Sequence, residues 1–263
     1  MRNAVRLHTL THLTCLRRNR IFHAFLMLVI VGLALTIVPG LAFDDDSNRF
    51  QTLRRLAQML HGTISWVTSG IGLFLLWEHR RTRSLEMVAT TAAPFGAWVA
   101  SLFATATLVG IAMHATSVVL IFCLSWVWGV TYQYGFIYLA LDHAAQSLIS
   151  LGVVTMLGVV LHPVIAVVLV ALVNESTVLI LRQGLDMLSP SLMLRVTKVL
   201  AAGLYYILPV QDPFGERTEA LVRTMRAAES DWRYLAGTAA YALLVLAFAH
   251  VSTLVMLRRR PGT

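Results

Sequence analysis

The chain has 263 residues, of which 57% are hydrophobic and 13% charged, with a mean hydropathy of +0.72. This composition lies far outside the range of water-soluble proteins. The formal net charge of +8 does not indicate nucleic-acid binding, because the basic residues are mostly arginines that flank apolar blocks instead of forming one patch. Each apolar block is about 20 residues long, which is what a helix needs to cross a hydrocarbon core of about 30 Å. Several blocks occur, so a single-pass anchor is excluded.

Residues 1–20 are basic and loosely amphipathic, which predicts a helix that lies in the membrane interface. The apolar run from Phe25 to Phe43 follows these arginines, as in a secretory signal. Its nearly 20 residues exceed the usual apolar core of about 7–15 residues, however, and more apolar runs follow. We therefore interpret this run as part of a first, retained span.

The whole sequence predicts an all-α membrane protein that forms one transmembrane domain over residues 1–263. His162 and Pro163 predict a tight reversal between the fourth and fifth spans, because proline cannot continue a preceding helix. The six predicted spans are residues 21–43, 59–77, 96–124, 136–161, 164–181 and 234–257.

Residues 182–233 form the longest connection between predicted spans. Apolar and polar positions separate onto opposite helical faces on either side of a turn-rich break at residues 211–215. This pattern predicts two short amphipathic helices on the outer surface, before the last span.

Orientation follows from the positions of the arginines. Five lie in residues 1–20, three in residues 78–94 and three in residues 258–263, whereas the short outer segment 44–58 has three. Positive charge favours the cytoplasmic side, and the long connection carries less weight because the rule holds best for short loops. Both termini and residues 78–94 are therefore expected in the cytoplasm.

Residues 78–98 carry the most informative motif. Glu78 is followed by basic residues, then by Ser84-Leu85-Glu86, an apolar turn and Pro94 just before the third span. This segment resembles the cytoplasmic coupling segment of type-2 ABC exporter permeases, and the layout of six spans with a long outer segment before the last is also similar. Arg83 stands where that family usually has glycine.

The resemblance implies a permease subunit of an exporter in the bacterial inner membrane that is not itself an enzyme. It implies no cofactor in this chain, with ATP and Mg on a separate ABC ATPase dimer, and a second permease copy as partner. The residues expected to couple to the ATPase are Glu78, Arg83, Leu85, Glu86 and Pro94. The run Tyr205 to Pro209 is also similar to a Tyr-x-Leu-Pro pattern in some such permeases, including the group linked to maturation of multicopper enzymes.

Several polar residues lie inside the predicted spans. Asp142 and Gln146 share one face of the fourth span, and Glu175 lies near the middle of the fifth. A charged group facing lipid is costly, so these residues are candidates for the wall of a substrate route. Hydrogen bonding between neighbouring helices is the alternative explanation.

The remaining motifs favour neither metal binding nor catalysis. His61, Ser65 and Ser69 share a face of the second span, while His114, His143 and His250 are scattered over other spans. His8 and His12 have the spacing of a metal pair but lack an adjoining glutamate, and the two cysteines are not expected to pair. A polytopic membrane enzyme, either a lipid transferase or an intramembrane hydrolase, remains the alternative, followed by a secondary transporter or an assembly subunit.

Overall fold

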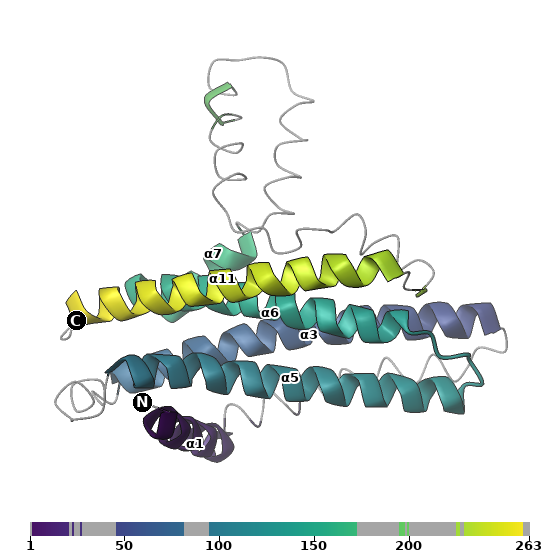
Figure 1. Cartoon of the computed structure of the whole chain (residues 1–263), viewed down its shortest axis with the longest axis horizontal. Helices are drawn as coiled ribbons and strands as arrows, with labels where there is room; N and C mark the ends of the chain where they lie inside the picture. Colours follow the sequence, from purple (N-terminus) through teal and green to yellow (C-terminus); the bar gives the residue numbers. More distant parts are fainter. Residues whose placement is uncertain are drawn as a thin grey trace.

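The computed structural model describes residues 2–20, 23, 27, 46–81, 95–172, 195–197, 199, 225–226 and 229–259. Within these residues all regular structure is helical and no strand occurs. The helices are α1 (Arg2–Arg18), α3 (Asp46–Arg81), α5 (Phe95–Val127), α6 (Gly135–Val160), α7 (Pro163–Leu172) and α11 (Glu229–Arg259). The four long helices α3, α5, α6 and α11 lie along a common direction, and α1 packs on α5 at one end of this bundle (Figure 1).

The four long helices are also long and apolar enough to cross a membrane. They coincide with the predicted second, third, fourth and sixth spans, so the chain is an all-helical, multi-pass membrane protein. The predicted first span at residues 21–43 lies almost entirely outside the described residues. Of the predicted fifth span only the part within α7 is described, so the count of six spans stays a prediction.

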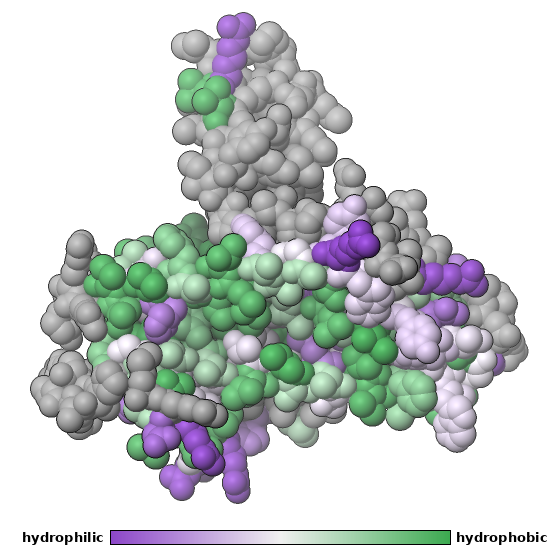
Figure 2. Space-filling view, in the orientation of Figure 1, coloured by the Kyte–Doolittle hydropathy of each residue, from purple (hydrophilic) through white to green (hydrophobic). Residues whose placement is uncertain are grey.

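The bundle presents an apolar surface where a bilayer would surround it. The most apolar windows of α5 and α11 are only 22% buried, against 61% for α3. Leu244 and Phe248 of α11 are 70% and 65% exposed, and Figure 2 shows hydrophobic residues over most of the bundle's visible face. Exposed residues of this kind match the lipid hydrocarbon, which requires no polar partner.

Helix α3 begins well before the predicted second span. It starts at Asp46 and has 36 residues, whereas hydropathy alone places the start of the span at residue 59. Its early turns bury Leu53, Leu56 and Leu60 in a cluster with Trp128 and Phe136 at one end of the bundle. Apolar residues at helical spacing therefore extend α3 beyond the strongly apolar window.

The same end of the bundle contains a close backbone contact. The amide of Gly135, at the start of α6, donates a hydrogen bond of 2.8 Å to the carbonyl of Met225. A Cβ atom at Gly135 would overlap the backbone of Met225, which itself has a φ of 52°. Glycine is therefore required here for close approach.

The reversal between α6 and α7 is confirmed. Helix α6 ends at Val160 and α7 begins at Pro163, the helical position where a missing backbone donor costs least. The Nδ1 atom of His162 accepts a hydrogen bond of 3.3 Å from the amide of Val164. His162 thus satisfies one of the free amides at the start of α7.

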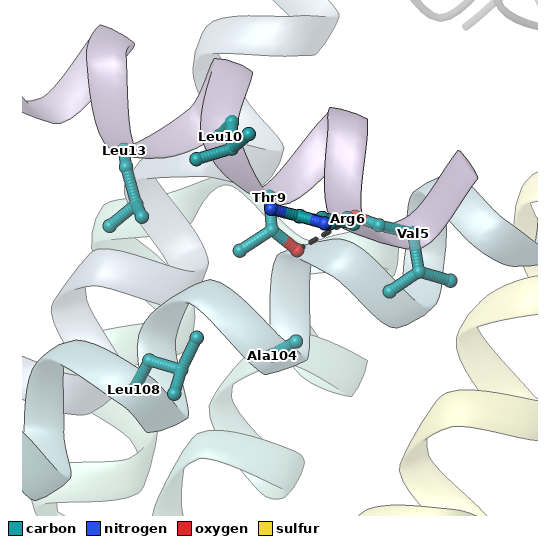
Figure 3. Close-up of a pocket in the computed structure, with 7 residues that line it drawn as sticks. All are labelled: Val5, Arg6, Thr9, Leu10, Leu13, Ala104 and Leu108. Atoms are coloured by element: carbon teal, nitrogen blue, oxygen red, sulfur yellow. Dashed lines mark hydrogen bonds between the residues drawn. The ribbon is translucent and has the colours of Figure 1, made fainter. Parts of the chain in front are cut away.

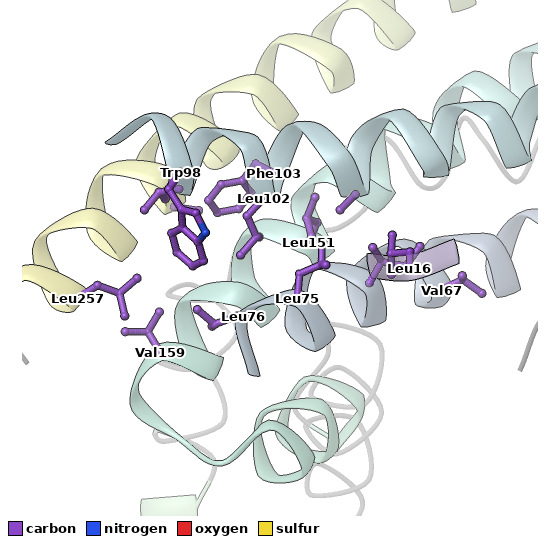
Figure 4. Packing of buried hydrophobic residues seen from close by; sticks show 14 residues of the cluster. Leu16, Val67, Leu75, Leu76, Trp98, Leu102, Phe103, Leu151, Val159 and Leu257 are labelled. Atoms are coloured by element: carbon purple, nitrogen blue, oxygen red, sulfur yellow. The ribbon is translucent and has the colours of Figure 1, made fainter. Parts of the chain in front are cut away.

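The opposite end of the bundle joins five helices through one apolar cluster. Figure 4 shows Leu16 of α1, Leu75 of α3, Trp98 of α5, Val159 of α6 and Leu257 of α11 in this cluster. All five side chains are less than 9% exposed. Helix α1, the end of α3, the start of α5 and the end of α11 therefore share one end of the bundle (Figure 1).

Candidate functional site

Three histidines from three helices meet inside the bundle. The rings of His61 in α3 and His114 in α5 stack with centroids 5.2 Å apart, and the ring of His143 in α6 stacks on His61 at 6.1 Å. His61 and His114 are 1% and 4% exposed. These three residues are far apart in the chain.

A serine lies beside each of these histidines and completes a hydrogen-bonded network. Ser117 donates a bond of 2.7 Å to the backbone carbonyl of His114 and lies 3.1 Å from Nδ1 of His61. Since the single hydroxyl proton of Ser117 is already used, its oxygen accepts from Nδ1 of His61. That assignment makes Nδ1 of His61 the donor in its 3.0 Å contact with Nδ1 of His114.

The network continues from α5 to α6 and back to α3. His114 accepts at Nδ1, so a neutral His114 carries its proton on Nε2 and donates to the hydroxyl of Ser147 at 3.1 Å. Ser147 lies 2.8 Å from the hydroxyl of Ser65, which lies 3.0 Å from the carbonyl of His61. The rings of His61 and His114 and three hydroxyls thus link α3, α5 and α6, and the ring of His143 stacks on His61.

These residues carry a weak sequence signal that was missed. His61 precedes Ser65 by four residues, His143 precedes Ser147 by four, and His114 precedes a serine by three. Each histidine and its serine therefore lie on one face of their helix. Across the described part of the chain, no group of three or more histidine, cysteine or acidic residues is arranged to hold a metal ion. The cluster is a hydrogen-bonding network.

The predicted route residues are only partly brought together. Asp142 is 1% exposed, and its Oδ2 accepts a hydrogen bond of 2.8 Å from Nε2 of Gln146 one turn later. Asp142 thus faces protein and not lipid, consistent with the high cost of a lipid-facing carboxylate. Glu175 lies outside the described residues.

A second polar cluster holds α1 on the bundle. Nε2 of His12 lies 3.0 Å from the hydroxyl of Ser101, and Nδ1 of His12 lies 3.0 Å from Nε2 of His79 at the end of α3. Ser101 donates to the carbonyl of Trp98, so it accepts from His12, and His12 accepts from His79. The rings of His12 and His79 both stand edge-on to Trp98.

The environment of α1 favours the neutral forms of His12 and Cys15. Burial, reinforced by His79 and His8, lowers the pKa of His12 from 6.5 to about 3. Burial together with the Glu78 carboxylate raises the pKa of the Cys15 thiol. His12 is 1% exposed, and its two hydrogen bonds hold α1 on the bundle.

This second cluster borders the predicted coupling segment on both sides. Helix α3 ends at Arg81 and α5 begins at Phe95, so α1 contacts the helices that enter and leave residues 82–94. Glu78 is within α3, whereas the other predicted coupling residues lie outside the described part, namely Arg83, Leu85, Glu86 and Pro94.

Comparison with known protein families finds no match, and no curated protein or solved structure shows significant similarity to the chain.

Proposed function

We propose that this chain is the permease subunit of an ABC exporter, which moves a substrate with energy from ATP hydrolysed by a separate ATPase. The observation that carries the proposal is the position of α1. A basic amphipathic helix packs on α5 and hydrogen-bonds to the end of α3, the two helices that flank residues 82–94, the segment that resembles the coupling segment of type-2 permeases. A partner that binds this end of the bundle therefore has access to both features at once.

Movement at this end would be transmitted directly into the bundle. His12 contacts α3 through His79 and α5 through Ser101, and Leu16 is buried in the cluster shared by five helices. Packed interiors deform little and shift as units. An ATPase that displaces residues 82–94 would thus displace α1 and the ends of α3 and α5 together.

The arrangement of the termini supports the orientation that the arginines predict. The three segments assigned to the cytoplasm by charge are residues 1–20, 78–94 and 258–263, and the described parts of all three border the same end of the bundle (Figure 1). We place this end in the cytoplasm, with both termini inside. A second permease copy completes the transporter, because one chain with six spans is too small to enclose a route.

The substrate is proposed only by chemical class. Asp142, Gln146 and Glu175 would provide acidic and hydrogen-bonding groups within the membrane, which favours a cationic or hydrogen-bonding cargo. The pair of Asp142 and Gln146 also fits the alternative role of a structural bond within α6.

Binding of the ATPase tests the proposal. Leu85→Asp, which puts a charge on the predicted apolar side of the coupling segment, should weaken co-purification of a co-expressed ABC ATPase subunit and lower ATP hydrolysis by the reconstituted complex. Tyr134→Asp is the matched control, because Tyr134 is 75% exposed at the opposite end of the bundle. Full retention of the ATPase and of its activity by Leu85→Asp would refute the coupling role.

One observation favours a membrane hydrolase as the second candidate. The 3.1 Å separation of Nε2 of His114 and the Ser147 hydroxyl is within the reach of a nucleophile and its base, but catalysis would require the His114 tautomer with Nε2 unprotonated, the reverse of the one assigned above. Ser147 is, however, only 2% exposed. A fluorophosphonate probe distinguishes the two functions: labelling that Ser147→Ala abolishes would support the hydrolase, and no labelling is expected of the permease.

A further inference from the structure

A hollow of about 730 Å³ lies between part of α1 and α5. Figure 3 shows five lining residues from α1, among them Val5, Leu10 and Leu13, and two from α5, Ala104 and Leu108. Its volume lies within the range of about 300–1,000 Å³ typical of small-molecule sites. The hollow is open at the surface of the bundle.

The wall of the hollow offers almost no polar partner to a ligand. The hydroxyl of Thr9 donates to the carbonyl of Val5 at 2.8 Å, so its proton is already used within α1 (Figure 3). The other lining residues are apolar apart from Arg6. A peptide placed here would leave backbone groups unpaired, which is costly, and a small free anion would gain nothing from the apolar wall.

Arg6 supplies a single positive charge at the edge of this apolar wall. Its side chain is exposed, and residues 1–20 contain five arginines and no acidic residue. A guanidinium group binds phosphate oxygens through paired, charge-assisted hydrogen bonds. The site therefore combines an apolar wall with one phosphate-binding group.

Helix α1 is also suited to contact with a bilayer. Leu7 and Leu10 are 65% and 53% exposed, whereas Leu16 of the same helix is buried against the bundle. Basic hollows between the helices of membrane proteins bind acidic lipid headgroups. We infer that the hollow between α1 and α5 binds an anionic phospholipid, with an acyl chain along the apolar wall and the phosphate at Arg6.

The bound lipid would strengthen the attachment of α1. The hollow touches Ala104 and Leu108, one and two turns beyond Ser101, where His12 docks. A ligand that contacts α1 and α5 together binds the docked arrangement better than the separated one, and so stabilises it. Binding of a lipid at this site does not depend on an ATPase partner.

Native mass spectrometry of the full-length protein from nanodiscs tests the inference. The nanodiscs contain equal amounts of phosphatidylglycerol and phosphatidylcholine with the same acyl chains. The wild type should retain more phosphatidylglycerol, and Arg6→Gln should lower that preference about fivefold, as expected for one cation near an anionic lipid. Arg17→Gln, which removes an exposed arginine outside the hollow, should change it less than twofold. Equal losses of the phosphatidylglycerol preference in both variants would show a general attraction between arginines and anionic lipid and would refute a specific site at Arg6.

Filling the hollow with a larger side chain provides an independent test. Ala104→Phe should reduce retention of both lipids, whereas Ala115→Phe, at an exposed position elsewhere on α5, should not. Unchanged retention in Ala104→Phe would overturn the acyl-chain part of the inference. Displacement of phosphatidylglycerol by millimolar inorganic phosphate would identify a free-anion site and overturn it too. If Ala104→Phe does not fold, the Arg6→Gln comparison decides.

Discussion

Replacing His114 with leucine should weaken the attachment of α5 to α3 and α6. The substitution removes two side-chain hydrogen bonds, of 3.0 Å to His61 and 3.1 Å to Ser147. Such bonds inside membrane proteins contribute about 0.6 kcal/mol each on average, so the loss is about 1.2 kcal/mol. The remaining groups keep other partners, since His61 still contacts Ser117 and Ser147 still contacts Ser65. No further penalty for an orphaned polar group therefore applies.

The free energy of unfolding in mixed micelles, measured by denaturant titration, checks this value. A loss of 1.2 kcal/mol lowers the ratio of folded to unfolded protein by about sevenfold. Thr116→Val is the control on the same helix, because Thr116 is exposed and its hydroxyl bonds only to its own helix. A double-mutant cycle with Ser147→Ala should give a coupling of about 0.6 kcal/mol. Zero coupling, or equal stability of His114→Leu and the wild type, would refute the network.

Three further perturbations should have defined results. Acidification should release α1: the pKa of His12 is about 3 when docked and 6.5 when free, so docking is fully favoured above pH 6.5 and weakens by up to about tenfold per pH unit down to pH 3. Distances between spin labels on α1 and α5 measure this, and His12→Gln should weaken the pH dependence. Glu78→Gln should move the pH midpoint of Cys15 alkylation downward, because the Glu78 carboxylate helps to raise the pKa of that thiol. In thermal unfolding, Gly135→Ala should cost roughly 1–3 kcal/mol through overlap with the backbone before α11, whereas Gly62→Ala, where a Cβ meets nothing within 4 Å, should stabilise by roughly 0.5–1 kcal/mol.

The sequence predicts the helices better than it predicts their lengths. Apolar runs locate four of the predicted spans because crossing lipid requires a long apolar helix. Hydropathy does not detect helical turns outside the apolar window, so a span predicted from residue 59 does not reveal that α3 begins at Asp46. The spacing of Leu53, Leu56, Ala57 and Leu60 does carry the signal, since these residues share one helical face and are buried.

The polar clusters could not be predicted because they depend on how helices align. His61, His114 and His143 each belong to a different helix, and a shift of one helix by a single turn would separate them. Docking of α1 through His12 likewise depends on the position of His79, which is 67 residues away in the chain. The burial of Asp142 was predictable, because the cost of a carboxylate in lipid constrains its side chain whatever the neighbouring helices are.

The length of α3 has a mechanical consequence. Its 36 residues contain no proline and form one unbroken helix, about 54 Å long at 1.5 Å per residue. His79 contacts α1 near one end, His61 joins the buried network, and Arg49 near the other end donates to the carbonyl of Trp128 at 3.3 Å. Sharp helix bends arise mainly at prolines, Gly/Ser pairs, π-bulges or inserted groups. Helix α3 contains Ser69 and Gly70 but runs unbroken through them, so we expect it to move as a lever. A tilt of about 5° at the His79 end would move the far end by about 5 Å. A displacement of α1 would thereby reach the opposite side of the membrane through one helix.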